Sequence, residues 1–148
     1  MLTGLTKFAG EVVRQRGSSP KLQVYNTALL TVLSGMTPSE AVEDREFWGR
    51  LTESAVGAHL ANAAFSGECD IFYWRDRNRE VDFIVRGHDC LLAIEVKSGR
   101  KRSSLQGLTT FEQTFHPQRV LLIGADGIPL EHFLSRSVTY WLSQDHAG

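Results

Sequence analysis

The sequence contains few cysteines, few prolines and no long apolar run. It has two cysteines, Cys69 and Cys90, and four prolines among 148 residues. The cysteines form no CxxC pair and no zinc-ligand pattern with the five scattered histidines, so we expect two reduced thiols. No apolar run approaches the roughly 18 residues of a membrane span, and charged residues interrupt the N-terminal segment before a signal peptide develops. These absences predict a cytoplasmic protein without a membrane partner.

Several enzyme classes have short motifs that this sequence does not contain. It has no G-x-S-x-G or Cys/His arrangement for acyl transfer and no H-E-x-x-H for zinc proteolysis. It also has no G-x-G-x-x-G for dinucleotide binding and no G-x-x-x-x-G-K-[ST] phosphate loop. The chain is therefore not expected to be an ATPase itself.

Positive charge is concentrated in one segment although the formal net charge is only −1. Residues 75–102 hold eight of the sixteen lysines and arginines, together with five acids. A planar guanidinium can donate two hydrogen bonds to one phosphate, but basic clusters are also common on ordinary solvated surfaces. The candidates for binding the DNA backbone without reading its sequence are Arg75, Arg77, Arg79, Arg100, Lys101 and Arg102.

Residues 1–43 are expected to form an N-terminal, mainly helical extension. An amphipathic segment over about Leu2–Gln15 is followed by a short extended stretch at Lys21–Tyr25 and an apolar helix around Thr27–Leu33. Thr37-Pro38-Ser39-Glu40 has the pattern of a capping box with proline at the first helical position. These elements are too few to bury a core alone, so they should pack on the remainder or end a domain that begins earlier.

Residues 44–148 have the pattern of an α/β domain. Asp44 is expected to cap a helix that reaches Phe65, and three strands are expected over Cys69–Arg75, Arg79–Arg86 and Cys90–Ser98. A second capping box at Ser103 should open a helix that ends at Pro117. A strand over 119–123 and one or two short helices over 129–142 complete the order helix, three strands, helix, strand.

Hydrophobic matching predicts the register of the second and third strands. A two-residue His88-Asp89 turn sets Val81, Phe83 and Val85 opposite Val96, Ile94 and Leu92, whereas an odd-length turn gives poorer matches. The preferred register also places Asp82 opposite Glu95, and Glu80 opposite Lys97. Opposed like charges destabilise a sheet unless a cation compensates them.

Oxygen ligands of this kind favour Mg²⁺ or Mn²⁺ as the compensating cation. Glu53 adds a third carboxylate, because it lies on the apolar stripe of the first long helix, between Gly49 and Gly57, which would allow close approach to the sheet. The simpler alternative for Glu53 is a pair with Arg50 at the edge of that stripe.

The pattern of Asp82, Glu95-x-Lys97 and a preceding helical Glu53 resembles the active site of the PD-(D/E)XK nuclease superfamily. The order of elements resembles its restriction-endonuclease-like core as well, although Val81 stands where a proline is usually written. A second resemblance covers nearly the whole chain, and the segments that carry it include Gly17-Ser18-Ser19-Pro20-Lys21, Gly49-Arg50-Leu51-Thr52-Glu53, Tyr73-Trp74-Arg75 and Glu95-Val96-Lys97-Ser98. These segments resemble the uncharacterised, nuclease-like C-terminal domain of predicted prokaryotic AAA+ ATPases. The chain would then begin near the end of a winged helix, beyond the ATPase module, which is absent from it.

This resemblance implies a metal-dependent hydrolase of DNA phosphodiesters. Glu53, Asp82, Glu95 and the carbonyl of Val96 would hold Mg²⁺ or Mn²⁺, and Lys97 would orient the attacking water. Gln106 could touch phosphate, although helix capping explains it sufficiently. Tyr73 and Trp74 could stack on bases, but a place in the core or at an interface is the better explanation for both.

Two other hypotheses remain at this point. The same fold could serve as a non-catalytic module that binds nucleic acid or docks onto the ATPase part, with Glu80–Lys97 and arginine–carboxylate pairs neutralising each other. Alternatively, the domain could be purely structural, with Arg75 or Arg79 relieving the Asp82–Glu95 opposition. DNA is the expected partner, and self-association into a homo-oligomer is left open.

Overall fold

A computed structural model describes residues 2–10, 19–98, 105–124 and 126–143 of the chain. The described residues form a mixed α/β fold with one six-stranded sheet in the order β2-β1-β3-β4-β5-β6. The strands are β1 (Leu2–Lys7), β2 (Lys21–Val24), β3 (Asp70–Asp76), β4 (Arg79–Arg86), β5 (Leu91–Val96) and β6 (Arg119–Ile123). The β1–β3 and β5–β6 pairs are parallel and the other pairs are antiparallel.

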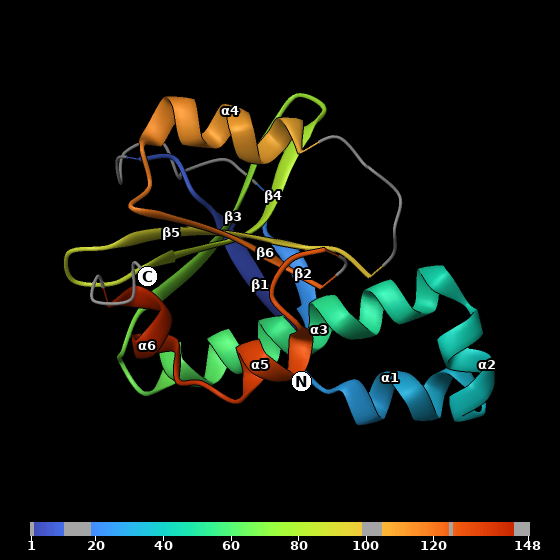
Figure 1. Ribbon diagram of the computed structural model, residues 1–148. Coiled ribbons are helices and arrows are strands. Elements are labelled where there is room, and N and C mark those ends of the chain that lie inside the picture. The colour runs from blue at the N-terminus through green and yellow to red at the C-terminus, as the bar shows by residue number, and fades with distance from the viewer. Residues whose placement is uncertain (1, 11–18, 99–104, 125, 144–148) are drawn as a thin grey trace.

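Helices cover both faces of the sheet, which gives three layers (Figure 1). α3 (Arg45–Phe65), α5 (Leu130–Leu134) and α6 (Val138–Leu142) lie on one face, and α4 (Gln106–Phe115) lies on the other. α1 (Thr27–Ser34) and α2 (Pro38–Glu43) contact α3, at the end of the molecule away from α6. No helix in the described ranges has the length and apolar character needed to cross a membrane.

Two apolar cores follow from these layers. The α3-side core lies between the sheet and α3, α5 and α6, and its fully buried members include Val56, Leu60, Phe83, Ile94 and Phe133. The α4-side core lies between the sheet and α4 and contains Phe8, Phe72, Trp74, Val81, Ile84, Ala93, Leu108 and Phe111. The sheet is therefore buried on both faces, as its near-continuous apolar central strands require.

Local signals in the sequence placed most helix ends correctly. Asp44 accepts hydrogen bonds from the N–H groups of Glu46 and Phe47 and caps α3, and Thr37 and Glu40 form the expected capping box of α2. The helix after β5 differs from its expectation, because it begins at Gln106 with Leu105 in the N-cap position. Its expected capping residue, Ser103, lies outside the described residues.

The expectation for the N-terminal segment was wrong in one respect. Leu2–Lys7, expected to lie in an amphipathic segment of a mainly helical extension, forms β1 and lies between β2 and β3 in the sheet. Leu5 and Phe8 supply the reason, because Leu5 is buried in the α3-side core and Phe8 in the α4-side core. A segment that must contribute to both faces of one sheet is extended, since successive side chains of a strand point to opposite faces.

Candidate active site

The hairpin of β4 and β5 has the predicted register over its paired part. Phe83 pairs with Ile94 and Val85 with Leu92, and the N–H of Gly87 donates to the carbonyl of Cys90 across the His88-Asp89 turn. The ladder ends at Phe83–Ile94, so the expected Val81–Val96 pair is not part of it. The strands therefore separate where the acidic residues begin.

A register shift in β4 explains this separation. Phe72 of β3 pairs with Ile84 and Trp74 pairs with Val81, so Asp82 and Phe83 together stand opposite Tyr73. Such a bulge breaks the alternation of a strand. Accordingly Val81 and Ile84 both pack in the α4-side core, whereas the sequence pattern had placed them on opposite faces.

The Asp82 carboxylate occupies the gap that the bulge opens. Its Oδ2 accepts a hydrogen bond of 2.8 Å from the backbone N–H of Val96. Burial raises the pKa of Asp82 to about 7, and the charges of Glu95 and Glu53 add to the rise, while the Val96 N–H and Lys21 act against it. Asp82 is thus near both other predicted acids, and it is partly buried, so its ionisation is costly.

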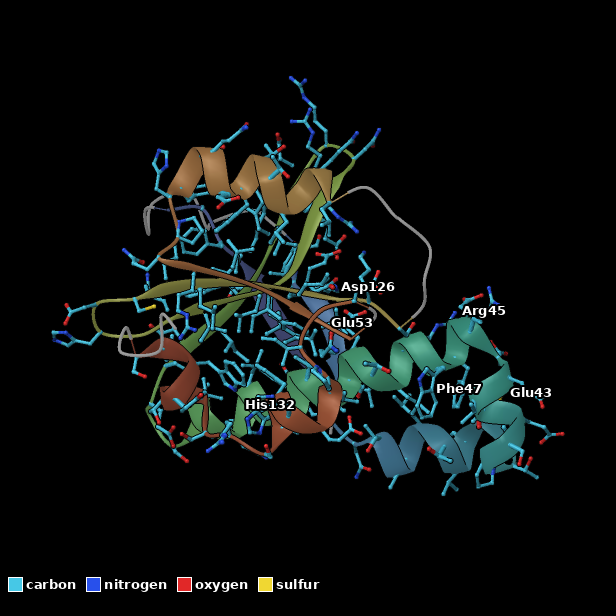
Figure 2. All side chains as sticks on the ribbon, viewed as in Figure 1. Glu43, Arg45, Phe47, Glu53, Asp126 and His132 are labelled. Atoms are coloured by element: carbon cyan, nitrogen blue, oxygen red, sulfur yellow. The ribbon has the colours of Figure 1, made fainter. Side chains whose placement is uncertain are left out.

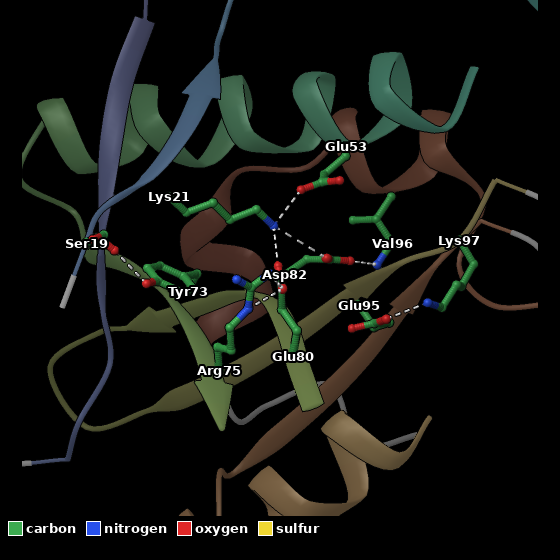
Figure 3. Close-up of polar contacts among 10 residues, drawn as sticks. All are labelled: Ser19, Lys21, Glu53, Tyr73, Arg75, Glu80, Asp82, Glu95, Val96 and Lys97. Carbon is green, nitrogen blue, oxygen red and sulfur yellow. Dashed lines mark hydrogen bonds and ion pairs between the residues drawn. The ribbon is translucent and has the colours of Figure 1, made fainter. Parts of the chain in front are cut away.

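Lys21 connects the acidic residues and was not among the predicted site residues. Its ammonium lies 2.9 Å from Oε1 of Glu53, 2.8 Å from Oε1 of Glu80 and 3.8 Å from Oδ1 of Asp82 (Figure 3). Burial alone would lower the pKa of Lys21, but the charges and hydrogen bonds of Glu53, Glu80 and Asp82 outweigh burial and raise it. Lys21 comes from β2, so the N-terminal strands belong to the site.

Glu53 reaches this network because α3 approaches the sheet closely at Gly57. A Cβ added there would lie 3.2 Å from side-chain atoms of Gln23, Tyr25 and Phe83, so only glycine fits without displacement. Glu53 therefore points from α3 toward the sheet (Figures 2 and 3). Arg50, its alternative partner, pairs with Glu46 instead.

Glu95 and Lys97 form a separate pair on β5. The Lys97 ammonium lies 2.5 Å from Oε1 of Glu95, and Oε2 of Glu95 is buried without a hydrogen-bond partner in the described part of the chain. The expected pairing of Glu80 with Lys97 is not formed, because Glu80 pairs with Lys21 and Arg75. These two cations overcome the effect of burial and lower the pKa of Glu80.

The carboxylates of Glu53, Asp82 and Glu95 are the type of ligand that a hard divalent cation prefers. One of their oxygens, Oε2 of Glu95, has no hydrogen-bond partner in the described part of the chain. Within the described ranges no three histidine, cysteine, aspartate or glutamate side chains are grouped closely enough to hold a metal ion. The Lys21 ammonium lies between Glu53, Glu80 and Asp82 instead. A cation at Asp82 and Glu95 would therefore require these side chains to rearrange.

The arginines predicted to bind DNA lie at one end of the β3–β4 hairpin. Arg75 and Arg79 are exposed strand residues, and Arg77 lies in the turn with φ +53°. Arg100, Lys101 and Arg102 lie outside the described residues. Tyr73 and Trp74 are buried, which agrees with their alternative role as core residues, and Gln106 is an exposed residue at the start of α4.

A family profile, domain of unknown function (DUF4143), matches residues 48–141, which is more than half of the chain. The chain belongs to the DUF4143 family. No curated protein and no solved structure matches it.

The DUF4143 match includes Glu53, Glu80, Asp82, Glu95 and Lys97, but it begins at residue 48 and so does not include Lys21. The cation that holds three of these carboxylates thus comes from outside the matched segment, and only the β2-β1-β3 pairing brings it there. A sequence signal for it did exist. The four acids at the site outnumber Lys97, the lysine predicted there, and this imbalance is a signal for a further cation, although it does not identify Lys21.

Proposed function

We propose that this DUF4143 domain hydrolyses phosphodiester bonds of DNA with the help of Mg²⁺ or Mn²⁺. The observation that carries the proposal is the unbalanced group of carboxylates around Asp82. Glu53 and Glu95 both raise its pKa, and one oxygen of Glu95 is buried without a partner in the described part of the chain. A restriction-endonuclease-like core and action beside an AAA+ ATPase module belong to the same proposal and are supported by the sequence resemblance.

In this proposal each residue has a separate role. Glu53, Asp82, Glu95 and the Val96 carbonyl would hold the metal, which when bound polarises a phosphoryl oxygen and makes water a better nucleophile at neutral pH. Lys97 would orient the attacking water and stabilise the charge that develops on the phosphate. In the metal-free protein burial raises the pKa of Asp82 to about 7, and a bound metal would favour the ionised carboxylate that acts as its ligand. Arg75, Arg77 and Arg79 would contact the DNA backbone.

Metal titration tests the ligand set. We expect Mn²⁺ or Mg²⁺ binding by calorimetry in the metal-stripped wild type and its loss in both Asp82→Asn and Glu95→Gln. Glu112→Gln, which removes an exposed acid on α4, is the matched control and should leave binding unchanged. Unchanged binding in both site variants would rule out the metal site.

Cleavage assays test the chemistry. With Mg²⁺ or Mn²⁺ the wild type should nick plasmid DNA or cut single-stranded, duplex or branched oligonucleotides. Lys97→Ala should keep metal binding and lose cleavage, because the amine acts on water and phosphate rather than on the metal. Equal cleavage by the variant and the wild type would point to a contaminating nuclease.

A specific observation favours a second candidate, a non-catalytic module of the same fold. Lys21 already neutralises Glu53 and Glu80, and in that case it would be a permanent substitute for the metal. Lys21→Met separates the two candidates. A catalytic site predicts that the wild type binds Mn²⁺ and that the variant binds it about tenfold more tightly, because a competing charge is gone. A non-catalytic module predicts binding only after the substitution.

A further inference from the structure

A small pocket lies beside the acidic site, between the N-terminal strands and β3. Its cavity volume is about 340 Å³. Three of the described residues that line it are cationic and none is acidic: Lys7, Ser19, Pro20, Lys21, Tyr73 and Arg75. A concave site with several cationic donors is suited to an anion, and a phosphate group in particular.

The walls of the pocket are positioned by backbone pairing and by a tyrosine hydrogen bond, and neither contact uses the Lys7 ammonium. Lys7 pairs with Tyr73 in the parallel β1–β3 ladder. The Tyr73 hydroxyl donates a hydrogen bond of 2.8 Å to the carbonyl of Ser19, two residues before β2 begins (Figure 3). The shape of the pocket is therefore set by three strands and does not depend on the Lys7 ammonium.

The positive charge of the pocket is only partly neutralised. Lys21 is bound by Glu53 and Glu80, and Arg75 uses Nε and Nη2 to contact Oε2 of Glu80. A guanidinium has five N–H groups, so three of those of Arg75 remain for another acceptor. Lys7 forms no ion pair with any described residue.

We infer that this pocket binds a phosphate group of a polynucleotide backbone through the Lys7 ammonium and the remaining N–H groups of Arg75. Lys21 borders both the pocket and the carboxylates, so a phosphate held here lies next to the proposed cleavage site. The binding of a phosphate group follows from the pocket alone, and only its assignment to a polynucleotide backbone rests on the proposed function. Inorganic or terminal phosphate has the same recognition chemistry and is distinguished by the test below.

The test measures binding in EDTA, where metal-dependent cleavage does not occur. The probe is a 12-nucleotide single-stranded DNA with a 3′ fluorophore, followed by anisotropy at several salt concentrations. Lys7→Gln should weaken binding about tenfold and reduce the slope of log K against log salt by about one, as expected for one lost phosphate contact. Arg45→Gln is the control, because Arg45 is an exposed cation at the start of α3, outside the pocket (Figure 2).

Two further arms identify the phosphate. The loss in Lys7→Gln should be equal for strands with a 5′-phosphate and a 5′-hydroxyl; a loss confined to the phosphorylated strand would overturn the backbone assignment in favour of a terminal group. Equal affinity of Lys7→Gln and the wild type, with unchanged melting temperatures, would overturn the pocket altogether. Because no metal is present, either result stands whether or not the protein cleaves DNA.

Discussion

Asp82 lies where a bulged strand, a helix and a second strand meet. Its carboxylate replaces a backbone acceptor for the Val96 N–H, and the bulge in β4 gives it the room to do so. Burial and the neighbouring Glu95 and Glu53 raise its pKa from 3.8 to about 7. Between about pH 4 and pH 7, Asp82 therefore carries a proton in the metal-free folded protein but is ionised in the unfolded chain.

This difference predicts a pH dependence of stability. Between about pH 4 and pH 7 the folded state binds more protons at Asp82 than the unfolded state, so its contribution to the free energy of unfolding falls as the pH rises. Each pKa unit corresponds to about 1.4 kcal/mol, so the rise from 3.8 to about 7 corresponds to a loss of about 4 kcal/mol over the whole range, of which about 2–3 kcal/mol falls between pH 5 and pH 8.

Urea unfolding in EDTA at pH 5 and pH 8 measures this effect. The drop in stability between the two pH values should be about 2–3 kcal/mol larger in the wild type than in Asp82→Asn, which cannot ionise. The same drop in both proteins would mean that Asp82 does not carry the pH dependence.

Helix α4 supports the strand that carries the acidic residues. A Cβ added at Gly107 would lie 2.1 Å from the carbonyl oxygen of Glu80, so the first turn of α4 rests directly on the backbone of β4. Leu108 and Phe111 follow on the same side and fill the α4-side core. Glycine at position 107 thus determines how closely the helix approaches β4 beside the site.

Gly107→Ala should destabilise the protein by about 2–3 kcal/mol, because the new methyl group meets backbone rather than a flexible side chain. Thr109→Ala, at an exposed position of the same helix, should change the free energy of unfolding by less than about 0.5 kcal/mol. Urea denaturation of the three proteins checks both values, and a Gly107→Ala protein as stable as the wild type would show that α4 can shift without cost.

The six strands form one sheet in which the N-terminal pair is not peripheral. β1 lies between β2 and β3, and directly after it the Phe8 ring packs against the rings of Phe72, Phe111 and Phe115. Lys21 on β2 completes the ion pairs of the acidic site. Residues 2–24 therefore contribute to the core and to the site.

Phe8→Ala should lower the free energy of unfolding by about 3–4 kcal/mol, since it empties a buried aromatic position. Leu22→Ala is the matched comparison on β2, where the side chain is 68% exposed, and should cost less than about 0.5 kcal/mol. Thermal and urea unfolding would measure both. A small effect of Phe8→Ala would indicate that residues 2–10 do not pack on the sheet in solution.

Sequence patterns that span only a few residues were enough to predict much of the fold. The caps of α2 and α3, the limits of β4 and β6, and the β4–β5 register all followed from side-chain chemistry between neighbours in sequence or across one tight turn. Apolar matching across a hairpin is a local signal, because a slip of one residue exposes a whole buried face.

The assembly of the site depended on contacts between distant segments. Lys21 and Glu80 are 59 residues apart, and no local pattern pairs them. The bulge at Asp82 follows from how β3 and β4 pack between two cores, and β1 is extended because Leu5 and Phe8 must reach opposite faces of one sheet. Local chemistry thus specified most of the elements and the positions of the acidic residues, whereas long-range packing made residues 2–7 a strand and decided which cation compensates the acids.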